Sequence, residues 1–391
     1  MYQSSDEPEV KAIMYPAERS IAEILSKRES KGALRKLYVT DKGIDFCSND
    51  YLGFARSPLL SSMIDEAMSK LKVTNGSGGS RLLAGNSKYA EELEDFLAVK
   101  HAAPAALVFN SGYDANVGLF SSVPSTGDTI IYDELIHASI HDGIRLSRAT
   151  SFPFRHNDVA HLEERLQKAK GNVFVVVESI YSMDGDAAPL ENIVELCEKF
   201  IAHCIVDEAH ATGVFGLGKV QELGLQDKVY ARVYTFGKAM GCHGAVVLGS
   251  ALLKQYLVNY ARSFIYTTSL PLHSLVSIEC AYKLLEKSSE DVKKLHANIK
   301  YFKSMTFFQS KIKSDNKWID SQSAIQSLVV SGNEKVKKLA LAIQERNMDV
   351  RPIMSPTVSK GKERIRVCLH AYNTIDEIDV LLNVLGKRSD K

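Results

Sequence analysis

The stretch Arg232-Val233-Tyr234-Thr235-Phe236-Gly237-Lys238-Ala239-Met240-Gly241 joins a short apolar run to a lysine between two glycines. Read with a period of two residues, the run predicts a strand that ends near Phe236 and places Lys238 in an uncrowded turn. A lysine amine becomes a nucleophile when burial or a neighbouring cation lowers its pKa, and Schiff-base chemistry is its usual use. A lone lysine in such a turn is more often a solvated surface group, so the rest of the chain must decide between the two interpretations.

Six further runs of strand length surround this stretch and alternate with helical segments. They cover residues 105–109, 129–132, 150–154, 173–177, 203–206 and 245–248. The run 173–177 contains only valine and phenylalanine, which is typical of a strand buried on both faces. Strands that alternate with helices predict an α/β fold with a large domain built on a mostly parallel sheet flanked by helices.

The pattern changes along the chain and suggests separate parts. Helices are predicted at 18–37, 58–71, 87–100 and 159–170, and after about residue 285 lysine-rich helices accompany strands at 327–330 and 364–369 and a closing helix from Ile375. We expect an N-terminal helical arm and strand at 1–50, a large domain at 51–285 and a smaller C-terminal α+β domain at 286–391.

Composition bounds the class of partner. The net charge of +1 argues against nucleic acid or a membrane surface held by bulk electrostatics, and no apolar stretch approaches the ~20 residues of a membrane helix. The first residues lack the basic and apolar regions of a secretory signal. The six cysteines are scattered without a CxxC pair, so we expect free thiols in a reducing, cytoplasmic setting and no metal site.

Polar residues follow the predicted strands directly, where parallel α/β sheets bind ligands. Each has an ordinary structural alternative, such as a helix start, a core histidine or an N-cap. Together they match the needs of pyridoxal 5′-phosphate: a lysine for the Schiff base, an aspartate for the pyridinium nitrogen, a helix N-terminus with hydroxyls for the phosphate, and a ring for stacking. These residues are Ser111-Gly112-Tyr113, His137, Ser182, Asp207-Glu208-Ala209-His210, Thr235 and Lys238.

A nucleotide-binding alternative starts from the same region. Asp207-Glu208-Ala209-His210 is also the acidic box of helicase-type ATPases, and Gly213-Val214-Phe215-Gly216-Leu217-Gly218-Lys219 fits the pattern GxxxxGK. However, Val220 stands where a serine or threonine must reach Mg²⁺, and the glycine-rich loop follows the acidic box instead of preceding it. We therefore interpret the match as accidental.

A set of motifs in this order, from about residue 20 to the C-terminus, resembles the α-oxoamine synthases. These are fold-type I pyridoxal-phosphate enzymes that join an amino acid to an acyl thioester with loss of CO₂. The motifs are Ser48-Asn49-Asp50-Tyr51-Leu52-Gly53, Gly76-Ser77-Gly78-Gly79-Ser80, Ser182-Met183-Asp184-Gly185-Asp186, Asp207-Glu208-Ala209-His210-Ala211-Thr212-Gly213 and Thr235-Phe236-Gly237-Lys238.

The resemblance implies roles for individual residues. Three catalytic residues are implied: Lys238 for the Schiff base, Asp207 for the ring nitrogen and His137 for stacking. Further cofactor contacts are implied for His210 at the ring's phenolic oxygen, Ser182, Gly112, Tyr113, Thr235 and, from a partner subunit, Thr267 or Thr268. Substrate contacts are implied for Arg366 at the amino-acid carboxylate, Arg35, Asn49 and Thr357. Some relatives carry an arginine where this chain has Met354, with Arg351 a little upstream.

Additional motifs resemble the members of the family that condense L-alanine with a pimeloyl thioester in biotin biosynthesis. They are Ile265-Tyr266-Thr267-Thr268-Ser269, Ser323-Ala324-Ile325-Gln326 and Pro356-Thr357-Val358, together with the glycine loop. The resemblance also implies a homodimer. Two alternatives stay open: a related synthase that uses glycine or serine with another acyl-CoA, and a catalytically inactive scaffold subunit. The intact Lys238, Asp207 and His210 argue against the second.

Overall fold

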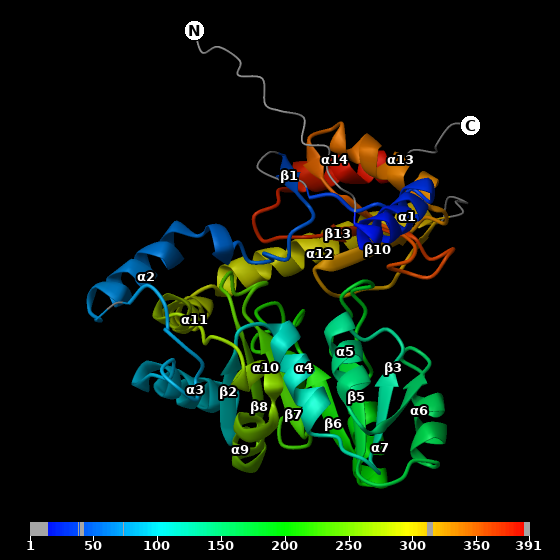
Figure 1. The fold of residues 1–391 in the computed structure, drawn as a ribbon. Helices are drawn as coiled ribbons and strands as arrows, with labels where there is room; N and C mark the ends of the chain where they lie inside the picture. The colour runs from blue at the N-terminus through cyan, green and yellow to red at the C-terminus, as the bar shows by residue number, and fades with distance from the viewer. Residues whose placement is uncertain (1–14, 38, 40–42, 73, 311–315, 387–391) are drawn as a thin grey trace.

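The computed structural model of the protein describes residues 15–37, 39, 43–72, 74–310 and 316–386. Its larger part is built on a seven-stranded sheet covered by helices. A smaller part, built on a four-stranded sheet, lies above one edge of the large sheet (Figure 1).

The large sheet has the strand order β2-β8-β7-β6-β5-β3-β4. All pairs from β7 to β4 are parallel, and only β8 runs antiparallel to its neighbours β2 and β7. The predicted α/β fold with a mostly parallel sheet is therefore confirmed. The strands are β2 (Ala105–Phe109), β3 (Thr129–Asp133), β4 (Thr150–Phe154), β5 (Val173–Glu178), β6 (His203–Asp207), β7 (Ala231–Thr235) and β8 (Ala245–Gly249).

Helices cover both faces of the large sheet because successive strand side chains point to opposite sides. Val176 packs in one buried cluster and its neighbours Val175 and Val177 in another. The first cluster contains side chains of α4 (Gly112–Ser122), α5 (Ala138–Leu146), α9 (Ala251–Tyr260) and α10 (Arg262–Ile265). The opposite face is covered by α6 (Val159–Leu166), α7 (Leu190–Phe200), α8 (Lys219–Glu222), α3 (Lys88–Lys100) and α11 (Leu272–Leu285).

The smaller part combines an antiparallel sheet of order β12-β13-β10-β9 with three helices. A separate two-stranded sheet pairs β1 (Ile44–Asp45) in parallel with β11 (Met348–Asp349), so the segment near residue 45 lies beside the C-terminal part. The division at residues 50 and 285 stays a proposal. The remaining elements are β9 (Lys317–Trp318), β10 (Ile325–Val329), β12 (Arg351–Ile353), β13 (Arg364–Cys368), α12 (Ser289–Ser310), α13 (Asn333–Gln344) and α14 (Ile375–Leu385).

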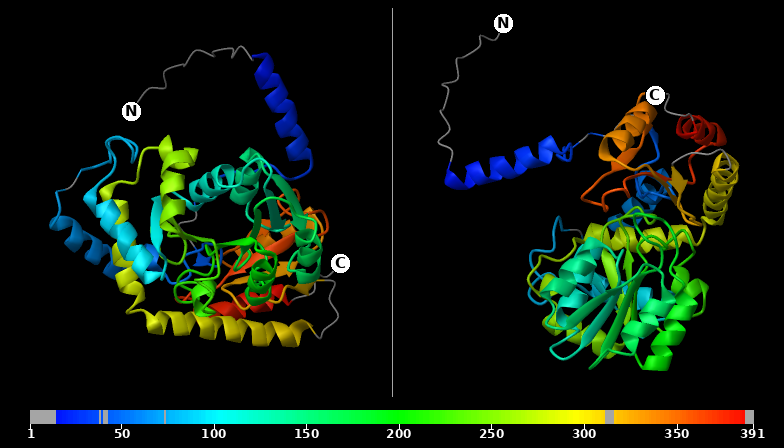
Figure 2. Two further views of the ribbon diagram at one scale, coloured as in Figure 1. Left: turned by 90° about the horizontal axis from the view of Figure 1, so that it is seen from below. Right: turned by 90° about the vertical axis from the view of Figure 1, so that its right-hand side faces the viewer.

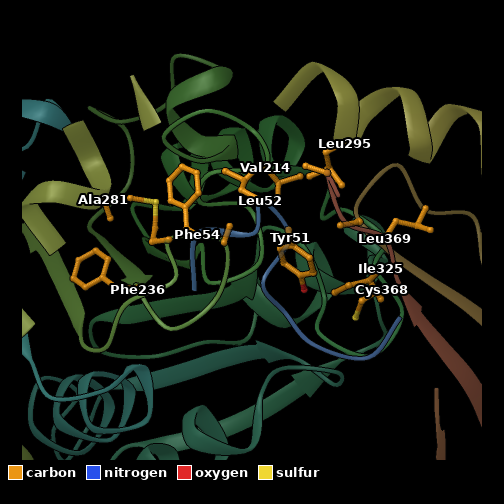
Figure 3. Packing of buried hydrophobic residues seen from close by; sticks show 14 of the residues in the cluster. Tyr51, Leu52, Phe54, Val214, Phe236, Ala281, Leu295, Ile325, Cys368 and Leu369 are labelled. Atoms are coloured by element: carbon orange, nitrogen blue, oxygen red, sulfur yellow. The ribbon is translucent and has the colours of Figure 1, made fainter. Parts of the chain in front are cut away.

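One buried cluster runs through both parts. Tyr51 and Leu52 lie between side chains of the large part, such as Phe236, and side chains of the small part, such as Ile325 and Cys368 (Figure 3). The same segment continues into η1 (Phe54–Arg56) and α2 (Pro58–Ser69). The chain therefore enters the large part through the interface between the two sheets, where polar residues at the strand ends also gather.

Three predicted helices end earlier than expected: the one predicted at 58–71 ends at Ser69, and two others end at least four residues early. The helix predicted at 18–37 is α1 (Pro16–Ser30), because Gly32 adopts φ +59° and the N–H groups of Gly32 and Ala33 donate to the carbonyls of Glu29 and Arg28, which ends the helix. The helix predicted at 159–170 is α6, which ends at Leu166 because Lys170 turns away to exchange two hydrogen bonds with Thr129. Helix α1 buries none of its side chains and projects from the body of the protein (Figure 2).

Among the described helices, none combines the length and the apolar composition needed to cross a membrane. All six cysteines carry free thiols, as predicted.

Candidate active site

Lys238 lies in a tight turn between β7 and β8, at the carboxyl end of the parallel strands. The N–H of Gly241 donates to the carbonyl of Lys238, and the N–H of Cys242 donates to the carbonyl of Phe236. Gly241 has φ +63°, and a Cβ there would lie 2.3 Å from the backbone nitrogen of Ala55. Glycine is therefore required at this position, and the turn is held against the segment that connects the two parts.

Some of the charges around Lys238 raise its pKa and others lower it. Burial lowers the pKa of Lys238 and the positive charge of Arg366 lowers it further, whereas Asp207 and Glu178 oppose this change. A lowered pKa increases the neutral fraction of the amine, which is the form that attacks a carbonyl carbon. Lys238 is half-buried and has a lowered pKa, so it differs from an ordinary solvated surface lysine.

Asp207 ends β6 as a buried carboxylate with fixed orientation. Its Oδ1 accepts the N–H of Ala209 at 2.9 Å, and its Oδ2 accepts Nδ2 of Asn116 at 2.8 Å. The same amide nitrogen of Asn116 also donates to Oγ of Ser139 at 3.0 Å. A short chain of hydrogen bonds thus connects Asp207 through α4 to the first turn of α5.

His137 caps the N-terminus of α5 and belongs to the same chain. Its Nδ1 lies 2.8 Å from Oγ of Ser139 and accepts the N–H of Ser139 at 3.3 Å. Burial lowers the pKa of His137, Asp207 opposes this, and Lys238 lowers the pKa further. The ring is therefore fixed at one edge and its uncharged form is favoured, which suits a ring that stacks on a pyridine.

His210 belongs to a second chain of hydrogen bonds, which reaches the small sheet. Its Nδ1 lies 2.8 Å from the hydroxyl of Tyr51, and that hydroxyl donates to Oδ1 of Asn49 at 3.0 Å. The same oxygen of Asn49 accepts Nη2 of Arg366 at 3.0 Å. Burial lowers the pKa of His210 well below its usual value, and the charge of Lys238 adds to this effect.

The N-terminus of α4 and the end of β7 form a cradle that fits a phosphate group. Ser111 caps α4 by accepting the N–H of Asp114 at 3.1 Å, and a Cβ on Gly112 would lie 2.3 Å from Cγ2 of Thr235. Oγ1 of Thr235 is buried and has no hydrogen-bond partner among the described residues. An unpartnered hydroxyl beside free helix N–H groups matches an anion site. Tyr113 is half exposed, and its hydroxyl donates to Asp142.

Thr267 and Thr268 lie beside the end of β2. Nδ2 of Asn110 donates to Oγ1 of Thr267 at 3.1 Å and to the carbonyl of Thr268 at 2.6 Å. Both threonines thus lie near the strand ends of their own chain. Their contribution to the site of a partner subunit stays a prediction.

Ser182 and Arg366 meet where the small sheet contacts the loop after β5. Nε of Arg366 donates to the carbonyl of Ser182 at 2.8 Å, and Nη1 lies 3.0 Å from Sγ of Cys368. No carboxylate of the described chain forms an ion pair with Arg366, although the side chain is partly buried. A partly buried guanidinium without a carboxylate partner is suited to bind one from a substrate.

Arg35 and Thr357 contact each other but not the Lys238 region. Nη2 of Arg35 donates to Oγ1 of Thr357 at 3.0 Å, and both side chains are exposed. Arg351 lies directly opposite Arg366 on the paired strands β12 and β13, and its Nε forms an ion pair with Asp349 at 2.8 Å. Since opposite residues on antiparallel strands share a face, both arginines leave the sheet on the same side.

The GxxxxGK-like segment is already engaged by the protein itself. The carboxylate of Glu208 accepts the N–H groups of Lys219 at 3.0 Å and Val220 at 2.6 Å. These are amides that a phosphate-binding loop would offer to a nucleotide. Arg81 of the glycine loop is engaged similarly, with Nη1 2.8 Å from the buried carboxylate of Glu94.

Sequence reasoning missed three residues of the site: Tyr51, Asn116 and Glu178. Tyr51 was part of a quoted motif without a role, because its contact with His210 joins segments far apart in the chain. Asn116 was missed because it lies within the helix, more than one turn after the Ser111 N-cap. Glu178 closes an apolar strand, and an acidic residue at the end of such a run was the signal that could have found it.

A lysine, an aspartate, two histidines and a helix N-terminus gathered beyond the carboxyl ends of this sheet define the class: a pyridoxal-phosphate enzyme of fold type I. The sequence model described as aminotransferase class I and II matches residues 41–385. The chain is 46% identical to an 8-amino-7-oxononanoate synthase of Emericella nidulans, over 94% of each chain. It is 36% identical to an aminoacyl transferase (sphA) of Aspergillus fumigatus, over 94% of this chain and 86% of the other.

A serine palmitoyltransferase from S. paucimobilis, solved with a bound aldimine of pyridoxal phosphate and myriocin, superposes with a TM-score of 0.85. It is 26% identical in sequence, over 94% of this chain and 96% of that one. The chain therefore belongs to the aminotransferase class I and II family, and within it to the α-oxoamine synthases. It is a pyridoxal-phosphate-dependent acyltransferase.

Proposed function

We propose that this enzyme condenses L-alanine with a pimeloyl thioester, carried by CoA or by a carrier protein, in biotin biosynthesis. A bond forms between Cα of alanine and the thioester carbonyl carbon, the thiol leaves, and the alanine carboxylate departs as CO₂. The product is 8-amino-7-oxononanoate. The observation that carries the choice of substrates is the identity of 46% with an 8-amino-7-oxononanoate synthase over nearly the whole of both chains.

Pyridoxal phosphate, when bound, supplies an electron sink for the negative charge that develops on Cα of the amino acid. The protein's own residues would prepare this site as follows. Lys238 would hold the cofactor through Nζ and would accept the Cα proton of the amino acid at the same atom. Its lowered pKa, caused first by burial, keeps a larger share of the amine able to accept that proton. Asp207 holds the pyridinium nitrogen, and Asn116 and Ala209 orient its two oxygens.

The other cofactor contacts would fix the ring in its plane. His137, uncharged and fixed at Nδ1, stacks on one face. His210 hydrogen bonds with the phenolic oxygen, while its other nitrogen is held by Tyr51. Gly112 at the N-terminus of α4 and Thr235 would hold the phosphate, and Tyr113 and Ser182 would be further cofactor contacts.

Arg366 would bind the carboxylate of alanine. Three of its N–H groups are engaged by Ser182, Asn49 and Cys368, which fixes the plane of the guanidinium. Because Asn49 also connects to Tyr51 and His210, the carboxylate and the cofactor ring are placed by one hydrogen-bond chain. Arg35 and Thr357 would then contact the acyl chain or its carrier.

We further propose that the enzyme is a cytoplasmic homodimer in which Thr267 or Thr268 completes the phosphate site of the partner subunit. Support comes from α1, a helix of 15 residues without one buried side chain. Isolated helices of ~12–15 residues are marginal in water, so α1 needs a surface to pack on. A second copy of the chain supplies such a surface.

A panel of amino acids tests the amino-acid specificity. We expect thiol release from pimeloyl-CoA to be fastest with L-alanine and much slower with glycine and L-serine. The second candidate function is a related synthase that uses serine, which the similarity to a serine palmitoyltransferase structure favours. A preference for serine or glycine would support this second candidate and contradict the first.

A further inference from the structure

Glu178 lies at the centre of the site but has no role in the chemistry derived above. It ends β5 and is the register partner of Asp207, which ends β6. Side chains of register partners in parallel strands leave the same face of the sheet, about 5 Å apart at the backbone. Glu178 is 2% exposed and Asp207 5% exposed, so two carboxyl groups meet here away from water.

The two oxygens of Glu178 have different surroundings. Oε2 accepts the N–H of Ser182 at 3.2 Å, and the N–H of His137 is a further hydrogen-bond partner of the carboxyl group. Oε1 is buried and has no partner among the described residues. One side chain thus joins the loop that carries Ser182 to the first turn of α5, which carries His137.

We propose that Glu178 is a positioning residue which, as an uncharged carboxylic acid, holds His137 and Ser182 in place and leaves the negative charge of the pair on Asp207. This inference rests on the cofactor roles proposed for His137, Ser182 and Asp207. Oε2 then acts as the carbonyl oxygen that accepts the amides. Oε1 carries the proton, and it has a hydrogen bond to donate when the site is filled.

The charges around the group favour this protonation state. Burial raises the pKa of Glu178 well above its usual value and Asp207 raises it further, whereas Lys238 and the amides of Ser182 and His137 lower it without cancelling the rise. Two carboxyl groups that share a buried site cannot both ionise at low cost. The proton resides on Glu178 because Asp207 has two hydrogen-bond donors, one to each of its oxygens, whereas Oε1 of Glu178 has none.

Two substitutions in the full-length enzyme separate the effect of a charge on Glu178 from the effect of its contacts. Glu178→Gln keeps an acceptor oxygen and stays neutral, so the dissociation constant for pyridoxal phosphate should stay within about twofold of the wild-type value. Glu178→Ala removes both amide contacts and should weaken cofactor binding at least about tenfold, which corresponds to about 1.4 kcal/mol. The pH midpoint of the cofactor's visible absorbance should be the same in Glu178→Gln as in wild type.

Glu208→Gln provides the matched control, because Glu208 is equally buried but bonds Ser179, Lys219 and Val220 outside the site. It should change thermal stability without changing the cofactor's dissociation constant. A midpoint for Glu178→Gln that falls by about one pH unit or more would show that Glu178 is an anion next to Lys238, because a nearby negative charge raises a lysine pKa.

Wild-type affinity in Glu178→Ala would overturn the positioning role. If Glu178→Ala does not fold, the absorbance midpoint of Glu178→Gln still decides the question of charge. If wild-type protein binds no pyridoxal phosphate at all, it is the proposed cofactor site that fails, whatever the variants do.

Discussion

Lys238 and the charges arranged around it are the residues on which the proposed chemistry depends. Its turn is fixed by Gly241, its pKa is lowered by burial, and Asp207 lies within electrostatic reach. The amine therefore has both the position and the protonation state for Schiff-base chemistry.

Lys238→Ala should abolish turnover and the visible absorbance of the lysine-bound cofactor, because it removes the amine proposed to hold the cofactor. Lys219→Ala is the matched control, since Lys219 lies in the GxxxxGK-like segment whose amides bond Glu208. The control should keep both signals. Absorbance and turnover measured on the two purified variants check the prediction, and retention of both by Lys238→Ala would refute the role of this lysine.

Arg366→Lys should raise KM for alanine at least about tenfold, because an ammonium cannot reproduce a bidentate fork. Cofactor affinity should change little. Arg351→Lys is the comparison, since Arg351 lies opposite Arg366 but is held by Asp349. Steady-state kinetics with varied alanine measure both effects. A larger rise in KM for Arg351→Lys would mean that Arg351, and not Arg366, binds the carboxylate of alanine.

Part of this site could be predicted from the sequence because polar residues directly after strands converge at one edge of a parallel sheet. That rule found Lys238, Asp207 and Thr235. It could not find Tyr51, whose place depends on how the small part packs against the large one. It also passed over Glu178, although Glu178 directly follows the predicted run 173–177; its place in the site depends on the register that pairs it with Asp207.

At the scale of elements, the loop after β5 connects the two parts beside the site. On the small-sheet side, Oγ of Ser327 donates to the carbonyl of Met183 and Arg364 forms an ion pair with Asp184. On the large-sheet side, the ring of His156 bridges Oδ1 of Asp133 at 3.0 Å and Oδ2 of Asp186 at 2.7 Å. Each ring nitrogen of His156 faces a carboxylate oxygen, an arrangement that favours the charged form of the ring.

The bridge predicts a pH dependence of stability. Burial alone would lower the pKa of His156, but hydrogen bonds to Asp133 and Asp186 raise it to about 9. The stabilisation is complete below the unfolded pKa of about 6.5 and is lost as pH rises toward 9, and it amounts to about 2–3 kcal/mol.

Urea unfolding of wild type and His156→Asn at pH 6 and pH 9 measures this effect. The free energy of unfolding should differ between the two proteins by about 2–3 kcal/mol at pH 6 and by much less at pH 9. An equal difference at both pH values would mean that His156 is not charged in the folded protein.

The elements themselves were predictable to different degrees. Seven strands of the large sheet were found because their apolar runs are continuous and separated by helices. The order of these strands in the sheet could not be predicted, because the antiparallel position of β8 between β2 and β7 depends on long-range packing. The predicted ends of helices were wrong where the backbone conformation ends the helix, as at Gly32 after α1.

At the scale of the whole molecule, α1 is the feature that a single chain leaves unexplained. Ile21, Ile24 and Leu25 are spaced on one face of the helix, and all three are exposed. Apolar faces of this kind mark association surfaces. We therefore expect them to be covered in the homodimer.

Light scattering on the protein as it elutes from a size-exclusion column should give twice the mass of one chain. The double substitution Ile21→Asp with Ile24→Asp should shift the protein toward the monomer, because it places two charges in an apolar contact. The double substitution Glu23→Gln with Lys27→Gln, on the same helix, should leave the dimer intact. A monomeric wild type would contradict the dimer, and a dimer unaffected by the aspartates would place α1 outside its interface.

Mass spectrometry of the reaction product tests whether the site around Lys238 joins alanine to a pimeloyl thioester. Purified enzyme with pyridoxal phosphate, L-alanine and pimeloyl-CoA should yield 8-amino-7-oxononanoate. With alanine labelled in its carboxyl carbon, the product should carry no label, because that carbon leaves as CO₂. A product that retains the label, or none with alanine when serine or glycine reacts, would contradict the account.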